Sequence, residues 1–114
     1  MTTPRTFELR TYRSAPGRLD ALSARFRDHT MDLFARHGIT VEGFWQALDA
    51  DDPATGTLVY VCSYASRESA AVAWKGFMED PVWQKARAES EVDGPLAERV
   101  ESLYVTPTDY SPMR

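Results

Sequence analysis

The chain has 114 residues and a mass of 12.9 kDa, which is the size of one domain. Hydrophobic residues make up 43% of the sequence and charged residues 26%, a balance that excludes a disordered or fibrous chain. The net charge of −4 excludes a general nucleic-acid binder, because such proteins carry a basic footprint. We therefore predict one domain over residues 1–114, large enough to bury a core without a metal or a disulfide.

Two features predict a soluble, cytoplasmic protein. The longest apolar runs, such as residues 58–62, are far shorter than the roughly 20 residues of a membrane span, and the first residues have no apolar signal core. Cys62 is the single cysteine, so it cannot form an internal disulfide. Because it lies in an apolar run, we expect an inert thiol in the core.

The first third of the chain predicts a strand followed by a long helix. Residues 7–12 largely alternate apolar and polar side chains, as a strand does, and Pro16-Gly17 ends that pattern. From Arg18 onwards the period changes to three and four, and Gly38 is the expected residue just past the helix end. The stripe of this helix comprises Leu19, Leu22, Phe26, His29 or Thr30, Leu33 and His37.

The remaining chain predicts two strands, a helix in two pieces and a final strand. Residues 41–48 and 58–64 are the strands, joined by an acidic loop over 49–56. Ser66 is the expected N-cap of the next helix, and Asp80-Pro81 starts its second piece, which ends by Gly94-Pro95. Residues 99–105 form the last strand, before a proline-containing tail over 106–112.

This order, β-α-β-β-α-β, predicts a ferredoxin-like α+β fold with a four-stranded antiparallel sheet. Two helices can cover only one face of such a sheet. The strands at 41–48 and 58–64 nevertheless carry apolar residues on both faces, which a water-exposed face would not. In the first of them, Val41, Gly43 and Trp45 are expected to share one face, opposite Phe44 and Leu48. We therefore expect a homodimer whose sheets pack face to face around a cavity.

The first strand carries the most informative polar residues. Phe7, Leu9 and Thr11 share one face, and Glu8, Arg10 and Tyr12 share the other. We expect the first set to pack under the helices and the second to point into the dimer cavity. Burying Glu8 and Arg10 unpaired would cost on the order of several kcal/mol each, so they form a structural ion pair or bind a ligand oxygen beside Tyr12.

Several other side chains could serve such a site. His29 is a core histidine or a general acid/base, while His37 is placed to stabilise the helix C-terminus. Aromatic residues either pack the core and interface or form the walls of a pocket for a flat apolar molecule, with Tyr110 of the tail at its mouth or on the partner subunit. The aromatic residues expected beside the pocket are Trp45, Tyr60 and Tyr104.

No glycine-rich phosphate loop, Cys-x-x-Cys or His-Glu-x-x-His motif occurs in the sequence. We therefore expect no cofactor and no metal. Haem binding would need His29 or His37 as an axial ligand, and no second feature of the sequence supports it.

Seven segments in order resemble the NIPSNAP family and cover nearly the whole chain; they are residues 7–12, 16–22, 26–29, 33–38, 43–45, 80–83 and 106–112. The resemblance, which is to bacterial single-domain members, implies a dimeric α+β barrel. The wider group with this architecture includes cofactor-free monooxygenases, isomerases and cyclases, haem-degrading enzymes and members without assigned chemistry.

From these residues we expect a cofactor-free enzyme acting on an apolar or aromatic small molecule inside the dimer barrel. In that hypothesis Arg10 binds a substrate oxygen, Tyr12 stabilises a developing oxyanion and His29 moves a proton, with Glu8, Trp45, Tyr60 and Tyr104 around the substrate. The alternative is a dimer that binds a ligand or a protein without catalysis. Neither hypothesis involves nucleic acid or a membrane.

Overall fold

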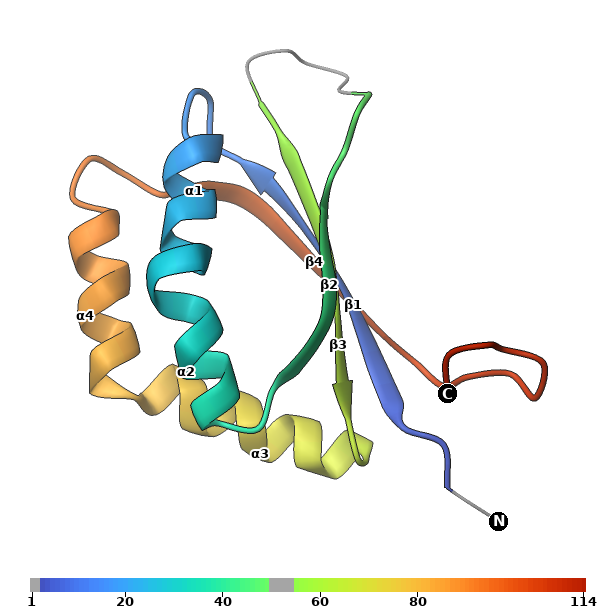
Figure 1. The fold of residues 1–114 in the computed structure, drawn as a ribbon. Coiled ribbons are helices and arrows are strands. Elements are labelled where there is room, and N and C mark those ends of the chain that lie inside the picture. Colours follow the sequence, from blue (N-terminus) through green and yellow to red (C-terminus); the bar gives the residue numbers. More distant parts are fainter. Residues whose placement is uncertain (1–2, 50–54) are drawn as a thin grey trace.

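A computed structural model describes residues 3–49 and 55–114 (Figure 1). The chain order is β1 (Thr6–Ser14), α1 (Leu19–Arg25), η1 (Phe26–Thr30), α2 (Met31–Arg36), β2 (Thr40–Gln46), β3 (Thr57–Tyr64), α3 (Arg67–Glu79), α4 (Pro81–Ser90) and β4 (Ala97–Val105). This confirms the predicted order of strands and helices. Most of the predicted acidic loop over 49–56 lies outside the described residues.

The four strands form one antiparallel sheet in the order β2-β3-β1-β4, which is the ferredoxin-like topology. All the helices lie on one face of this sheet, and we call that face the helix side and the other the open side (Figure 1). No helix in the described part of the chain is long and apolar enough to cross a membrane.

The first strand faces opposite to the prediction. Glu8 is buried on the helix side, and the Tyr12 ring on the same face meets the Phe26 ring at 5.4 Å between centroids. Leu9, on the other face, is 38% exposed on the open side. The prediction was wrong because alternation shows which residues share a face but not which face is covered.

A bulge in β2 changes which of its side chains share a face. Val41 pairs with Cys62 and Gly43 with Val61, so Glu42 is an extra residue in the ladder. One extra residue reverses the alternation. Val41 therefore lies on the helix side with the buried Cys62, while Gly43 and Trp45 lie on the open side, and the prediction that all three share a face was wrong.

The first helix is one continuous rod, α1–η1–α2, with a π-helical turn in its middle. The Thr30 hydroxyl in this turn donates to the Arg25 carbonyl at 3.2 Å. The extra residue of a π turn shifts the phase of the helix. Thr30 is consequently buried and His29 exposed, so the prediction of a core histidine was wrong and the alternative stripe position, Thr30, faces the core.

The structure confirms both predicted helix caps, Ser66 at the start of α3 and Asp80 between α3 and α4. Ser66 accepts a hydrogen bond from the Ser69 amide in a capping box, and Asp80 accepts one from the Val82 amide at 2.8 Å, with Pro81 at the first helical position. His37, at the end of α2 as predicted, also hydrogen-bonds Asp80 at 2.7 Å. Asp80 therefore links the ends of three helices.

Replacing Asp80 with alanine removes the cap of α4 and the partner of His37 together. We expect the melting temperature to fall by about 5 °C in calorimetry. Glu79→Ala is the matched control, because among residues 3–49 and 55–114 this exposed carboxylate pairs only with Lys75 on the surface of α3. Equal melting temperatures for the two variants would contradict the linking role of Asp80.

Candidate functional site

Three neighbouring strands align their helix-side residues in parallel rows. Glu8, Arg10 and Tyr12 form the middle row on β1, which we call the polar row. Their partners on β3 are Cys62, Tyr60 and Leu58, all buried; their partners on β4 are Tyr104, Ser102 and Val100. Because Val100 is 47% exposed and Ser102 is also exposed, the helices leave this part of β4 uncovered. The polar row thus lies at the boundary between the covered and uncovered parts of the helix side.

The Glu8 carboxylate is 1% exposed and accepts four hydrogen bonds. Its Oε1 accepts from the Tyr64 hydroxyl at 2.7 Å and the Trp74 indole nitrogen at 2.8 Å. Its Oε2 accepts from Arg10 Nη1 at 2.9 Å and from the Ser102 hydroxyl at 2.5 Å. Burial by itself raises the pKa of this carboxyl group, but the donors Ser102, Tyr64 and Arg10 outweigh burial and hold the pKa below its ordinary value. Glu8 is therefore a carboxylate at neutral pH.

The Arg10 guanidinium is held on three sides. Besides Glu8, it donates from Nε to the Tyr60 hydroxyl at 2.7 Å and from Nη2 to the Tyr12 hydroxyl at 2.8 Å. Its carbon lies 4.3 Å from the centroid of the Trp74 ring, within cation–π distance. Burial opposes the charge, but these oxygen partners hold the pKa of Arg10 above its ordinary value, so the cation is permanent.

The Tyr12 hydroxyl is the group of this hydrogen-bond network whose proton is available to a ligand. It accepts from Arg10 and lies 3.2 Å from the Tyr60 hydroxyl. Tyr60 is fully buried and already accepts from Arg10, so its own proton must go to Tyr12. The Tyr12 proton then has no acceptor among residues 3–49 and 55–114. Tyr12 is half-buried, so it can donate to a bound molecule.

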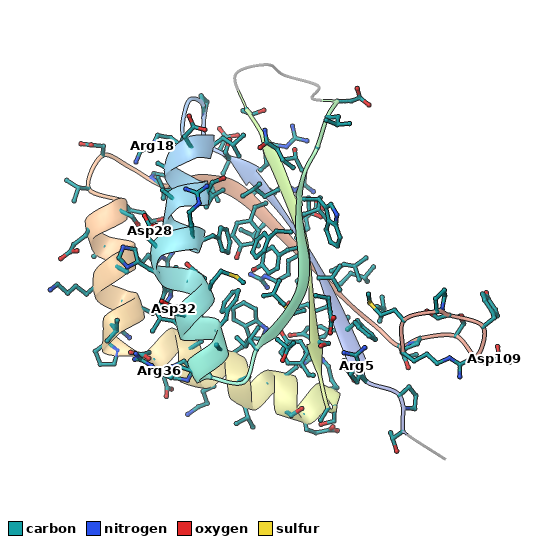
Figure 2. The ribbon with its side chains drawn as sticks, viewed as in Figure 1. Arg5, Arg18, Asp28, Asp32, Arg36 and Asp109 are labelled. Carbon is teal, nitrogen blue, oxygen red and sulfur yellow. The ribbon has the colours of Figure 1, made fainter. Side chains whose placement is uncertain are left out.

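The structure brings together only some of the predicted site residues. Tyr104 is half-buried beside the polar row, and the Arg67 guanidinium covers its ring at 3.6 Å. Trp45 lies on the open side at β2, away from the polar row, and no described contact joins His29 to Arg10 or Tyr12. Asp28 and Asp32, which lie before and after His29 on the rod, are both exposed along its surface (Figure 2).

Three partners of Glu8 were not predicted: Tyr64, Trp74 and Ser102. Each comes from a different element, namely the end of β3, the second turn of α3 and the middle of β4. All three carry an N–H or O–H group at a position that faces the sheet's helix side. The sequence contains these donors, and a buried acid requires such partners. Only the three-dimensional structure shows that these three side chains converge on Glu8.

The described residues contain neither a cluster of metal ligands nor a reactive thiol. No group of three or more His, Cys, Asp or Glu side chains there could hold a metal ion. Burial raises the pKa of the Cys62 thiol to about 12, in keeping with the predicted inert core thiol.

Glu8→Gln tests the electrostatic network through its pH dependence. The folded pKa of Glu8 is below the unfolded value of about 4.3, so its ionised form stabilises the fold above that pH and loses this effect as the pH falls. We expect the variant to lose roughly 2–3 kcal/mol of unfolding free energy at pH 7 in urea titrations. This deficit should shrink below about pH 4. A deficit that is constant from pH 7 to pH 3 would contradict the ionised state of Glu8.

Ser102→Ala removes only one of the donors to Glu8. It should therefore lower the unfolding free energy by only about 1 kcal/mol in the same titration.

Several solved structures share this fold over nearly their whole length. A NIPSNAP family protein of unknown function from Agrobacterium tumefaciens superposes with a TM-score of 0.79 at 22% identity, covering 97% of this chain and 95% of that one. A second NIPSNAP family protein from the same organism has a TM-score of 0.79 at 24% identity, covering 96% and 99%.

A more distant neighbour is a putative antibiotic biosynthesis monooxygenase from Chloroflexus aurantiacus, with a TM-score of 0.55 at 21% identity and coverage of 96% and 99%. No curated protein matches the sequence. The NIPSNAP family model matches residues 7–112. Since that model spans almost the entire sequence, the chain belongs to the NIPSNAP family.

Proposed function

We propose that this protein is a cofactor-free enzyme that binds an apolar or aromatic small molecule through an ionised oxygen. The observation that carries the proposal is the Tyr12 hydroxyl, which accepts from Arg10 and Tyr60 and keeps its own proton for a ligand. A phenol polarised by a cation is a strong donor to a negative oxygen. Such donors stabilise the oxyanions of enolates and phenolates.

The network leaves the protein without a free base at this position. Glu8 is occupied by four donors, and no histidine contacts the polar row within the described residues. A general base must reach the proton that it removes. The substrate is therefore a compound acidic enough to lose its proton to water once its oxyanion is stabilised, such as a phenol or a 1,3-diketone.

The uncovered part of β4 supplies the approach to the polar row. Val100 and the half-buried rings of Tyr104 and Trp74 offer apolar surface on either side of Arg10 and Tyr12. A flat molecule lying there would place one oxygen at Tyr12 and its rings on apolar side chains. Small-molecule sites commonly combine apolar walls with a few fixed polar groups.

An electron-rich phenolate or enolate can react with O2 directly, with the substrate itself supplying the electrons: a CH2 carbon becomes a carbonyl with one oxygen atom, and the other oxygen atom leaves as water. Such an anion can also rearrange. The reaction class is therefore a monooxygenation, an isomerisation or a cyclisation. The name of the C. aurantiacus neighbour, a putative antibiotic biosynthesis monooxygenase, supports the first of these. A dimer that only binds its ligand is the second candidate. It is favoured by the complete pairing of Glu8 and Arg10, because a fully satisfied network also makes a rigid binding surface.

The experiment uses 1-naphthol, whose anion absorbs at longer wavelength than the neutral form. We expect the protein to lower the apparent pKa of the bound probe by about one to two units, the equivalent of one charge-assisted hydrogen bond. Tyr12→Phe should abolish most of this shift. Tyr110→Phe makes the same chemical change in the exposed tail and should leave the shift intact.

Equal shifts in the wild type and Tyr12→Phe would refute the oxyanion role of Tyr12. Oxygen uptake with 1,4-dihydroxynaphthalene then separates the two candidate functions. Uptake above the spontaneous rate that depends on Tyr12 supports the enzyme, whereas a probe shift without any turnover of dihydroxynaphthalenes or 1,3-diketones supports the binding module.

We further propose that the working unit is a homodimer joined through the open side of the sheet. This face carries Leu9, Val59, Val61 and Leu103, none of which a helix covers, and Leu103 is 60% exposed. An antiparallel sheet with one face in water usually carries polar residues there. A second copy would cover these side chains with the same apolar surface, as a two-fold interface requires.

Leu103→Glu tests the homodimer. We expect light scattering after size-exclusion chromatography to give a mass about twice 12.9 kDa for the wild type and a monomer for the variant. Val72→Glu places the same charge on the exposed surface of α3 and should remain dimeric. A monomeric wild type at micromolar concentration would refute this assembly.

A further inference from the structure

A concave surface lies at the β2 edge of the molecule, between that strand and the α1–η1–α2 rod. This β2 groove has a volume of about 260 Å³. It is separated from the polar row by the Phe26 ring, which meets Tyr12 at 5.4 Å on one side and Phe44 at 5.0 Å on the other. The groove is therefore distinct from the site on which the proposed function rests.

The walls of the β2 groove are largely apolar. Phe26 and Met31 come from the rod, and Phe44 and Leu58 from the sheet. An apolar cavity of about 150 Å³ accommodates benzene. A groove of 260 Å³ lined by aromatic rings therefore matches a fused bicyclic ring or an apolar body of similar size.

Three polar side chains on the groove lining are unpaired. Ser23, Arg27 and Gln46 form no side-chain hydrogen bond or ion pair with any residue in the described ranges. The other arginines of the same region differ. Arg25 pairs with Glu91 and Arg36 with Asp80, while Arg18 donates to the Ser90 carbonyl. Arg27 thus brings an unneutralised cation to the apolar β2 groove.

The π-helical turn explains how these features come together. Phe26 and Arg27 are its first two residues, and Met31 follows its last residue directly. The aromatic floor and the cation of the groove therefore come from the π turn, and one flexible apolar wall comes from the residue directly after it. Such turns are frequent at functional sites because they re-aim side chains that a regular helix would distribute differently.

We infer that the β2 groove binds a monocarboxylate with a flat apolar body. The carboxylate would pair with Arg27 and accept hydrogen bonds from Gln46 and Ser23, and the apolar body would lie between Phe26, Phe44 and Met31. The inference does not depend on the oxyanion role of Tyr12, since none of these contacts involves the polar row.

Isothermal titration calorimetry with 2-naphthoate and with 2-naphthalenemethanol tests the inference. The two probes share one ring system and differ in charge. We expect naphthoate to bind about ten-fold more tightly than the alcohol, the value of one charge-assisted contact. Arg27→Gln should remove this preference. Arg36→Gln makes the same change at another exposed arginine of the rod, one that does not line the groove, and should keep it.

Met31→Trp provides a second variant, because the larger side chain fills the groove from a partly exposed position. It should weaken both probes at least ten-fold while circular dichroism reports an unchanged fold. Equal affinity of the two probes, or unchanged naphthoate binding in Arg27→Gln, would overturn the inference. Binding that is lost in Tyr12→Phe but kept in Arg27→Gln would overturn it as well, because the probe would then occupy the polar row.

Discussion

The Glu8–Arg10 pair is the constraint on which the rest of the structure depends. Two charged groups lie on the covered face of the sheet, and each would cost several kcal/mol if left unpaired. Their mutual contact at 2.9 Å satisfies only part of their hydrogen-bonding capacity. Hydroxyl and indole groups from β3, α3 and β4 satisfy much of the remaining hydrogen-bonding capacity. The pair therefore fixes how the edge strand β4 and the helix α3 lie against β1.

This arrangement explains why the element order could be predicted but the orientation of β1 could not. Alternation in residues 7–12, the cap at Asp80 and the glycine after the first helix are local signals, and local signals survive folding. The side of β1 that is covered depends on partners far away in the sequence. Tyr64 and Trp74 are 56 and 66 residues from Glu8, so only tertiary structure shows that burial of that carboxylate is compensated.

The bulge in β2 and the π turn in the rod also limited what the sequence could predict about side-chain direction. The extra residue Glu42 in β2 reverses the alternation that placed Val41 with Trp45, and the π turn in the rod exchanges Thr30 for His29 on the buried stripe. A periodic pattern of hydrophobic residues contains no mark of a single inserted residue. The prediction for Val41 failed at such an insertion, and the π turn decided between the two alternatives His29 and Thr30. The boundaries of the same elements were close to those observed.

The Trp45 indole has a consequence of its own, because it lies against the backbone of Gly43 two residues earlier. A methyl group at position 43 would come within 2.6 Å of the ring. Because Gly43 has no side chain, the Trp45 ring can lie along its own strand rather than extend from it. Any side chain at position 43 would push the Trp45 indole away from the strand. The smallest residue of β2 therefore determines how far the largest side chain of that strand projects from the molecular surface.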